Sequence, residues 1–227
     1  LDWFKYVKGI LDNIGAPAEI ISNAPTVSRF TLVSPTDRHV FLFGTETTIG
    51  TSATSDPLFL RFSSQEDYNT WIPTATNTAG SFRIQDGSKI MAAARSRGAI
   101  LVWTDTSLHA LQFVGPPFTF SLNQVGANCG AVSNHCVKDV NGITYWMSQN
   151  SFYMFDGAVK KIPCSVQDYV FGDFNITTQP ETYCGLNSEK NEITWFYCSA
   201  NAEQIDRYVS LNYLENSWSI GTLARTA

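Results

Sequence analysis

One local pattern recurs along this chain: an apolar run that contains a tryptophan, a short polar turn, and a second, half-apolar run. It occupies residues 100–113 and 143–155, and residues 192–199 begin a third copy. The central tryptophans lie 43 and then 49 residues apart in the sequence: Trp103, Trp146 and Trp195. A repeat of this length built from short strands is typical of the blades of a β-propeller.

Turn signals divide the chain into four blade-like units. Asn141-Gly142 and Asp156-Gly157 suit tight hairpins, because glycine, asparagine and aspartate tolerate positive φ angles. We therefore predict an all-β, β-propeller-like domain over residues 29–227, with about four consecutive four-stranded antiparallel blades. Rings have roughly four to eight blades, so an incomplete ring and a closed four-bladed ring both fit. The units span about residues 29–84, 88–125, 134–163 and 182–221.

The tryptophan runs are continuously apolar rather than alternating. Such runs are typical of strands that are covered on both faces, as when blades pack face to face. We predict that the structural core contains four large aromatic residues: Trp103, Trp146, Trp195 and Phe155.

The first residues follow a different pattern. Phe4, Val7, Leu11 and Ile14 have helical spacing, and a glycine and a proline follow them. We predict a short helix and a linker over residues 1–28. The chain starts at Leu1 rather than methionine, which suggests a fragment or a processed chain.

Two polar segments each place a tyrosine shortly before a tryptophan. They contain Tyr68 with Trp71, and Tyr213 with Trp218. We interpret these aromatics as lids that pack on blade edges, since aromatic side chains mostly serve packing. The alternative is a set of exposed platforms that bind a ligand.

No motif with a known catalytic mechanism is present in the sequence. It lacks GxSxG, HExxH and a glycine-rich phosphate loop, and its three histidines are scattered. We therefore expect no catalytic residue, no cofactor and no metal site. A propeller glycosidase would need two carboxylates roughly 5–10 Å apart. Its candidates lie at turns or strand starts, where solvated carboxylates are ordinary: Glu66, Asp67, Asp105 and Asp206.

Charge and cysteine content narrow the range of possible protein classes further. The net charge of −5 and the isoelectric point near 5.1 do not indicate sequence-specific nucleic-acid binding. No run is long enough to span a membrane as a helix. Five cysteines without a CxxC pair are typical of buried, reduced thiols, although Cys184 and Cys198 could be bridged if their strands are neighbours.

Several long strings resemble a family of tailed-bacteriophage virion proteins, described as tail-hub, head-closure or packaged-DNA stabilisation proteins. The resemblance covers roughly residues 40–227. The strings that carry it are residues 74–84, 100–105, 114–118, 144–147, 169–175, 206–209 and 221–227.

The resemblance implies a non-enzymatic structural protein of the virion tail, assembled in the bacterial host cytoplasm. It implies a subunit of a homo-oligomeric ring below the portal, which retains or conducts DNA. The implied partners are other virion proteins, namely the portal, an adaptor, and a tail needle or fibre. An acidic ring would let DNA slide, because binding through phosphates needs lysine and arginine. The alternative is a tail-tip or fibre propeller that binds host surface glycans.

Overall fold

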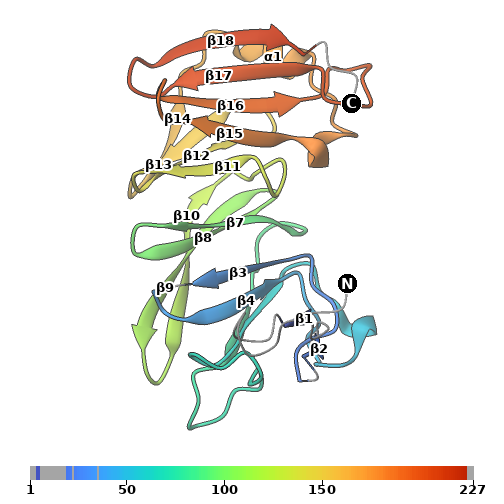
Figure 1. The fold of residues 1–227 in the computed structure, drawn as a ribbon, viewed down its shortest axis with the longest axis vertical. Coiled ribbons are helices and arrows are strands. Elements are labelled where there is room, and N and C mark those ends of the chain that lie inside the picture. The colour runs from blue at the N-terminus through green and yellow to red at the C-terminus, as the bar shows by residue number, and fades with distance from the viewer. Residues whose placement is uncertain (1–3, 6–18, 22, 35, 224–227) are drawn as a thin grey trace, which may run out of the picture. The chain divides into compact units, whose positions relative to one another are not determined.

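The structure, a computed structural model, describes residues 4–5, 19–21, 23–34 and 36–223 (Figure 1). The chain forms two compact units. The first contains residues 1–90 together with 113–121, and the second contains residues 91–112 together with 122–227.

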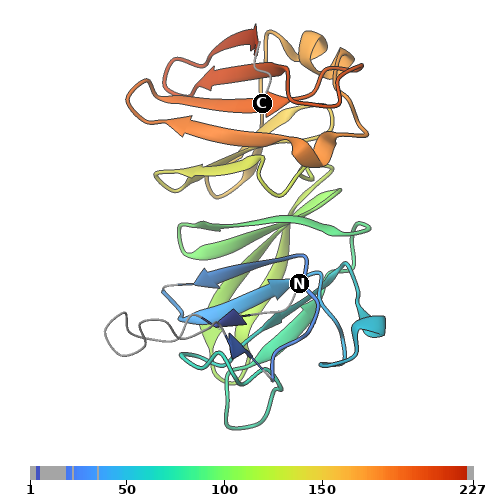
Figure 2. The same ribbon diagram turned by 45° about the vertical axis from the view of Figure 1, so that its right-hand side comes forward.

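Four four-stranded antiparallel sheets follow one another along the chain, and each strand pairs with the next in sequence (Figures 1 and 2). The first sheet contains β3 (Phe30–Ser34), β4 (His39–Phe43), β5 (Phe59–Phe62) and β6 (Gly80–Arg83). The second contains β7 (Ile90–Ser96), β8 (Ala99–Thr104), β9 (Ser107–Gly115) and β10 (Thr119–Ala127). The third contains β11 (Val137–Val140), β12 (Ile143–Met147), β13 (Phe152–Phe155) and β14 (Val159–Ile162). The fourth contains β15 (Tyr183–Asn187), β16 (Glu192–Tyr197), β17 (Arg207–Asn212) and β18 (Ser217–Thr222). This topology confirms the predicted all-β, propeller-like class of four consecutive meanders.

The predicted N-terminal helix is wrong in its described part. Phe4–Lys5 forms strand β1, which pairs antiparallel with β2 (Glu19–Ile20). Strand pairing therefore decides the conformation of Phe4 and Lys5, the first of which begins the helical spacing. The rest of the predicted helix, within residues 6–18, lies outside the described residues.

Helical structure is confined to short connections in the described chain. The helix α1 (Gln167–Gly172) and the 3₁₀ turn Gln179–Glu181 lie between the third and fourth sheets. A second 3₁₀ turn, Ser52–Thr54, lies between β4 and β5. The sequence patterns did not predict these elements, which are too short to show a helical period.

The core of the first unit is a cluster of phenylalanines. Phe41 and Phe62 are buried in the first sheet, and Phe120 from the β9–β10 hairpin packs on both. The ring centroids of Phe41 and Phe120 are 5.1 Å apart, and those of Phe62 and Phe120 are 4.9 Å apart. The end of this hairpin, residues 113–121, is therefore part of the first unit.

The core of the second unit contains the three repeated tryptophans, all completely buried. Trp103 contacts Trp146 at a centroid distance of 5.4 Å. The indole N–H of Trp146 donates to the Cys129 carbonyl at 2.7 Å, and that of Trp195 donates to the Cys136 carbonyl at 2.8 Å. Each of these two tryptophans thus joins apolar packing to a main-chain hydrogen bond.

Two positions differ from the predicted core. Phe155 is half-buried at the edge of the cluster, because it ends β13 beside the turn to β14. The third tryptophan strand, β16, alternates between buried and half-buried residues, whereas β8 and β12 are buried almost throughout. Only one face of β16 is therefore fully covered within the second unit.

The hairpin turns have the geometry that their residues favour. Asn141 and Gly142 have φ angles of 55° and 84° and join β11 to β12 directly. Gly157 has a φ of 116°, and the turn there contains three residues, because Phe155 pairs with Val159. Asp156 lies in the same turn and forms an ion pair with Lys160 at 2.5 Å.

Gly130 lies where the main chain passes close to the β8–β9 turn. A Cβ atom there would lie 2.2 Å from the carbonyl carbon and oxygen of Asp105. Because main-chain atoms cannot move aside as a side chain can, we expect Gly130→Ala to destabilise the protein by about 1–3 kcal/mol or more. Gly172→Ala is the control, since a Cβ atom at Gly172 has nothing within 4 Å. Equal midpoints of urea unfolding for the two variants would contradict this prediction.

Candidate interaction site on the first unit

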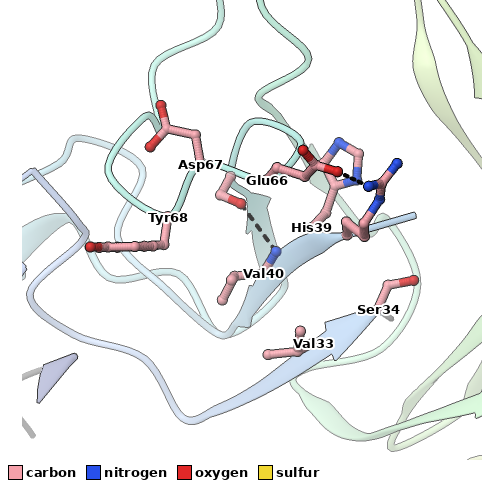
Figure 3. A pocket seen from close by; sticks show the side chains of 9 residues that line it. Val33, Ser34, His39, Val40, Glu66, Asp67 and Tyr68 are labelled. Atoms are coloured by element: carbon pink, nitrogen blue, oxygen red, sulfur yellow. Dashed lines mark hydrogen bonds and ion pairs between the residues drawn. The ribbon is translucent and has the colours of Figure 1, made fainter. Parts of the chain in front are cut away.

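An apolar groove lies on the face of β3 and β4 that is opposite Phe41 and Phe43. Val33 of β3 pairs with Val40 of β4, and the loop carrying Tyr68 stands across from them (Figure 3). One part of the groove has a volume of about 270 Å³ and extends towards His39. An adjoining part of about 190 Å³ is lined by Ile21, Ala24, Thr31, Val33, Val40, Leu42, Tyr68 and Trp71.

Tyr68 and Trp71 have different roles in this groove. Trp71 is buried, packs with Ala24 and Leu42, and donates its indole N–H to the Tyr68 carbonyl at 2.7 Å. Tyr68 is 42% exposed on the groove wall. Trp71 is therefore a packed side chain, and its hydrogen bond to the Tyr68 carbonyl helps to position the exposed ring of Tyr68.

A buried charged pair holds the tryptophan end of the loop. The guanidinium of Arg61 donates to the Trp71 carbonyl at 3.3 Å and to the Thr47 carbonyl at 2.7 Å. Burial lowers the pKa of Arg61, and the charge of the buried Glu46 opposes that shift. The carboxylate of Glu46 accepts from both the N–H and the hydroxyl of Thr26 at 2.9 Å. Hydrogen bonds between residues far apart in the sequence therefore fix the position of Trp71 in the groove wall.

The charged residues at the rim are engaged locally. Arg38 and Glu66 form an ion pair (Figure 3). The carboxylate of Asp67 accepts from the Thr70 hydroxyl at 2.6 Å and the Asn69 N–H at 2.8 Å. These hydrogen bonds, with that of Thr70 first, hold the pKa of Asp67 below its ordinary value. The Glu66 carboxylate is therefore engaged in an ion pair, and the Asp67 carboxylate is engaged in hydrogen bonds within its own loop.

His39 lies between the groove and the phenylalanine core. Its ring is completely buried, with Phe120 at a centroid distance of 5.0 Å and Phe62 at 6.1 Å. Its Nε2 and the Thr78 hydroxyl share a hydrogen bond of 3.1 Å, while Nδ1 has no partner among the described residues. Burial lowers the pKa of His39, and the nearby Asp37 opposes the shift. A neutral imidazole therefore suits this site.

The stability of the protein is expected to depend on pH through His39. Its pKa is lower in the folded chain than its ordinary 6.5, so the unfolded chain binds more protons below that pH. The contribution of the neutral ring is fully present above about pH 6.5 and is lost as the pH falls through the folded pKa. Urea unfolding between pH 7.5 and pH 5 should show a smaller loss of stability for His39→Phe than for the unaltered chain. Equal losses would exclude His39 as the cause.

The second tyrosine–tryptophan pair packs against the second unit. Trp218 lies with its ring centroid 4.7 Å from Phe152 and 6.2 Å from Trp195, and its indole N–H donates to the Pro163 carbonyl at 2.9 Å. The hydroxyl of Tyr213 donates to the Asn191 side chain at 3.1 Å. Both residues are half-buried, as expected for lids rather than for platforms.

The less covered face of the fourth sheet carries a row of aromatic side chains. Tyr183, Phe196 and Tyr208 are paired across three strands, and the Tyr183 and Phe196 rings stack at 4.7 Å. Tyr183 is 42% exposed. Tyr208 lies over Gly221, where a Cβ atom would come within 2.4 Å of its ring. Sequence reasoning missed this row, because its three members come from different strands and only the strand register brings them together.

The other candidate carboxylates occupy turns of the second unit. The Asp206 carboxylate accepts from the Ser199 N–H at 2.8 Å and the Ser199 hydroxyl at 2.7 Å. Asp105 lines a polar pocket of about 200 Å³ together with Asn128 and Asn150. The carboxylates named from the sequence are therefore divided between the two units and serve different turns.

Cysteines and histidines form no evident metal site in the described chain. None of the five cysteines forms a disulfide, so the bridge considered between Cys184 and Cys198 is absent. Burial, followed by the proximity of Cys136, raises the pKa of Cys184 to about 12. No group of three or more His, Cys, Asp or Glu residues within the described ranges could hold a metal ion.

In the part of the chain that the structure describes, no helix is both long enough and apolar enough to cross a membrane.

Comparisons with known proteins extend this description only slightly. No family model and no curated protein matches the sequence. Among solved structures, the chain is similar to the N-terminal domain of Nup159, with a TM-score of 0.33 and 11% identity over 88% of this chain and 63% of that one. It is also similar to a structure of S. cerevisiae Dbp5 bound to Nup159, Gle1, IP6 and ADP, with a TM-score of 0.31 and 9% identity over 89% of this chain and 63% of that one. The chain spans less than two-thirds of the length of each match, and likenesses this low carry no argument about function.

Proposed function

We propose that this chain is a structural protein of a bacteriophage tail, a tail-hub or head-to-tail connector subunit. In this role it docks below the portal as part of a homo-oligomeric ring, contacts other virion proteins, and helps to retain or conduct DNA. The proposal includes a non-enzymatic role. Its source is the resemblance of the strings within residues 40–227 to that virion family.

The structural observation that best supports an assembly role is the fourth sheet. Its tryptophan face packs within the second unit, but its other face carries the aromatic row of Tyr183, Phe196 and Tyr208, in which Tyr183 is 42% exposed. In β8 and β12, the corresponding strands, both faces are covered. Exposed apolar area of this kind is typical of protein interaction surfaces.

Host-glycan binding by a tail-tip or fibre propeller is the second candidate, and Tyr68 is the observation that favours it. An exposed aromatic ring beside a groove can stack on a sugar. The burial of Trp71 and the packing of Trp218 argue against the broader aromatic platform that this alternative requires.

The test is a cryo-EM reconstruction of the particle that carries this protein, without imposing full symmetry on the tail. We expect density for its four meanders in a ring around the DNA channel, in contact with the portal or an adaptor. Density only at peripheral spikes or at the distal tip would overturn the connector proposal. In that case, loss of host-cell adsorption in Tyr68→Ala particles would support glycan binding.

A further inference from the structure

The end of the β9–β10 hairpin is an exposed apolar tip. Phe118 is 76% exposed, Val114 is 53% exposed and Phe113 is 43% exposed. No charged residue occurs between Phe113 and Ser121. A contiguous apolar segment at a loop end costs solvation free energy unless another surface covers it.

The tip is held firmly by the residues directly beside it. Phe120 is buried in the phenylalanine core of the first unit, and its N–H donates to the Phe118 carbonyl at 2.7 Å. The ring centroids of Phe113 and Phe120 are 5.4 Å apart. These contacts hold the main chain of the tip, which lowers the conformational entropy that covering it would cost.

The groove beside Tyr68 has the size and chemistry to accept the tip. Its inner part, about 190 Å³, is walled by aliphatic side chains and by Tyr68 and Trp71. An apolar cavity of about 150 Å³ is enough to bind a benzene ring. A phenylalanine side chain therefore fits this part of the groove.

We propose that Phe118 of one copy inserts into the groove beside Tyr68 of a second copy. This contact rests on the proposed ring assembly and identifies the surfaces that would build the ring. The tip and the groove are different patches of one unit, so the contact is head-to-tail, and contacts of that type generate rings when the rotation closes. The second copy is required because Phe118 is exposed rather than seated in the groove of its own chain.

The charges around the groove are compatible with this occupant. The tip brings no charge, and Arg38 and Glu66 at the rim pair with each other. The inner part of the groove has no charged residue in its lining, so insertion there would bury no charge, which is the main penalty at an apolar contact. A single contact of this size is weak, and a closed ring strengthens it because each copy makes two.

The test is disulfide cross-linking between two variants of the 227-residue chain. Val114→Cys protein is mixed with Val33→Cys protein under mild oxidation, since Val114 lies in the exposed tip and leaves Phe118 in place, and Val33 lines both parts of the groove. The control mixture pairs Val33→Cys with Ile176→Cys, because Ile176 is 75% exposed on the second unit. We expect about tenfold more mixed dimer in the first mixture, owing to the higher effective concentration in a specific contact.

Equal yields in the two mixtures would overturn the proposal. Exclusive formation of cross-linked monomer by the double variant Val114→Cys/Val33→Cys would also overturn it, because the tip would then reach its own groove. The tail reconstruction tests the proposed function separately. A ring without this cross-link removes the contact and leaves the connector role standing, whereas a cross-link without a tail location removes the role and keeps the contact.

Discussion

Trp146→Ala is expected to lower the free energy of unfolding by about 3–5 kcal/mol, measured by urea or thermal unfolding. Trp146 is completely buried, contacts Trp103 and Tyr153, and donates to the Cys129 carbonyl. Alanine would leave a large cavity and an unpaired carbonyl in the centre of the second unit. A loss below about 1 kcal/mol would mean that the tryptophan does not form this core.

A matched pair of phenylalanine variants separates the hydrogen bond from the packing. Trp146→Phe loses a bond worth about 0.5–1.5 kcal/mol in addition to ring volume. Trp103→Phe loses volume only, because the Trp103 indole N–H is buried with no partner among the described residues. Trp146→Phe should therefore be the less stable variant. The reverse order would show that the Cys129 hydrogen bond contributes nothing measurable.

Arg61→Met is expected to destabilise the first unit by about 3–5 kcal/mol, because it removes one partner of a buried charged pair. Glu46 would remain buried without the neighbouring positive charge, and the Trp71 and Thr47 carbonyls would each lose a donor. The measurement is chemical unfolding followed by tryptophan emission and by circular dichroism.

The control for this prediction is the double variant Arg61→Met/Glu46→Gln. It removes both charges, so it should be more stable than the sum of the two single losses predicts. Additive losses of unfolding free energy would show that the charges of Arg61 and Glu46 do not interact. Arg83→Met supplies an exposed comparison, since the Arg83–Asp56 pair lies at the surface and should contribute about 1 kcal/mol or less.

Local chemistry explains why the four sheets could be predicted from the sequence. Asn141-Gly142 marks a turn by itself, and the tryptophan runs mark the second strand of three sheets. The groove could not be predicted in the same way. It depends on the hydrogen bond from Arg61 to the Trp71 carbonyl and on the one from Thr26 to Glu46. No rule of sequence spacing predicts that these residues are close together.

The errors have related physical causes. At Phe4 and Lys5, strand pairing with Glu19–Ile20 takes the place of the predicted helix, and this pairing is a non-local contact. Tyr68 and Trp71 looked equivalent in sequence, yet one is exposed and the other is buried. Phe118 and Phe120 also differ in exposure, because Thr119 between them has a φ of 60° and interrupts the strand alternation that would place them on one face.

The position of Phe120 has a consequence for the order of folding during synthesis. The first unit is discontinuous, and its phenylalanine core lacks Phe120 until the ribosome has passed residue 121. At about 5–20 residues per second, the interval after residue 90 lasts a few seconds. During that time Phe41 and Phe62 are without the ring that covers them. Vectorial folding therefore cannot complete this unit before three strands of the second sheet and the start of β10 have been translated, and the nascent chain is exposed to chaperones or to aggregation over that interval.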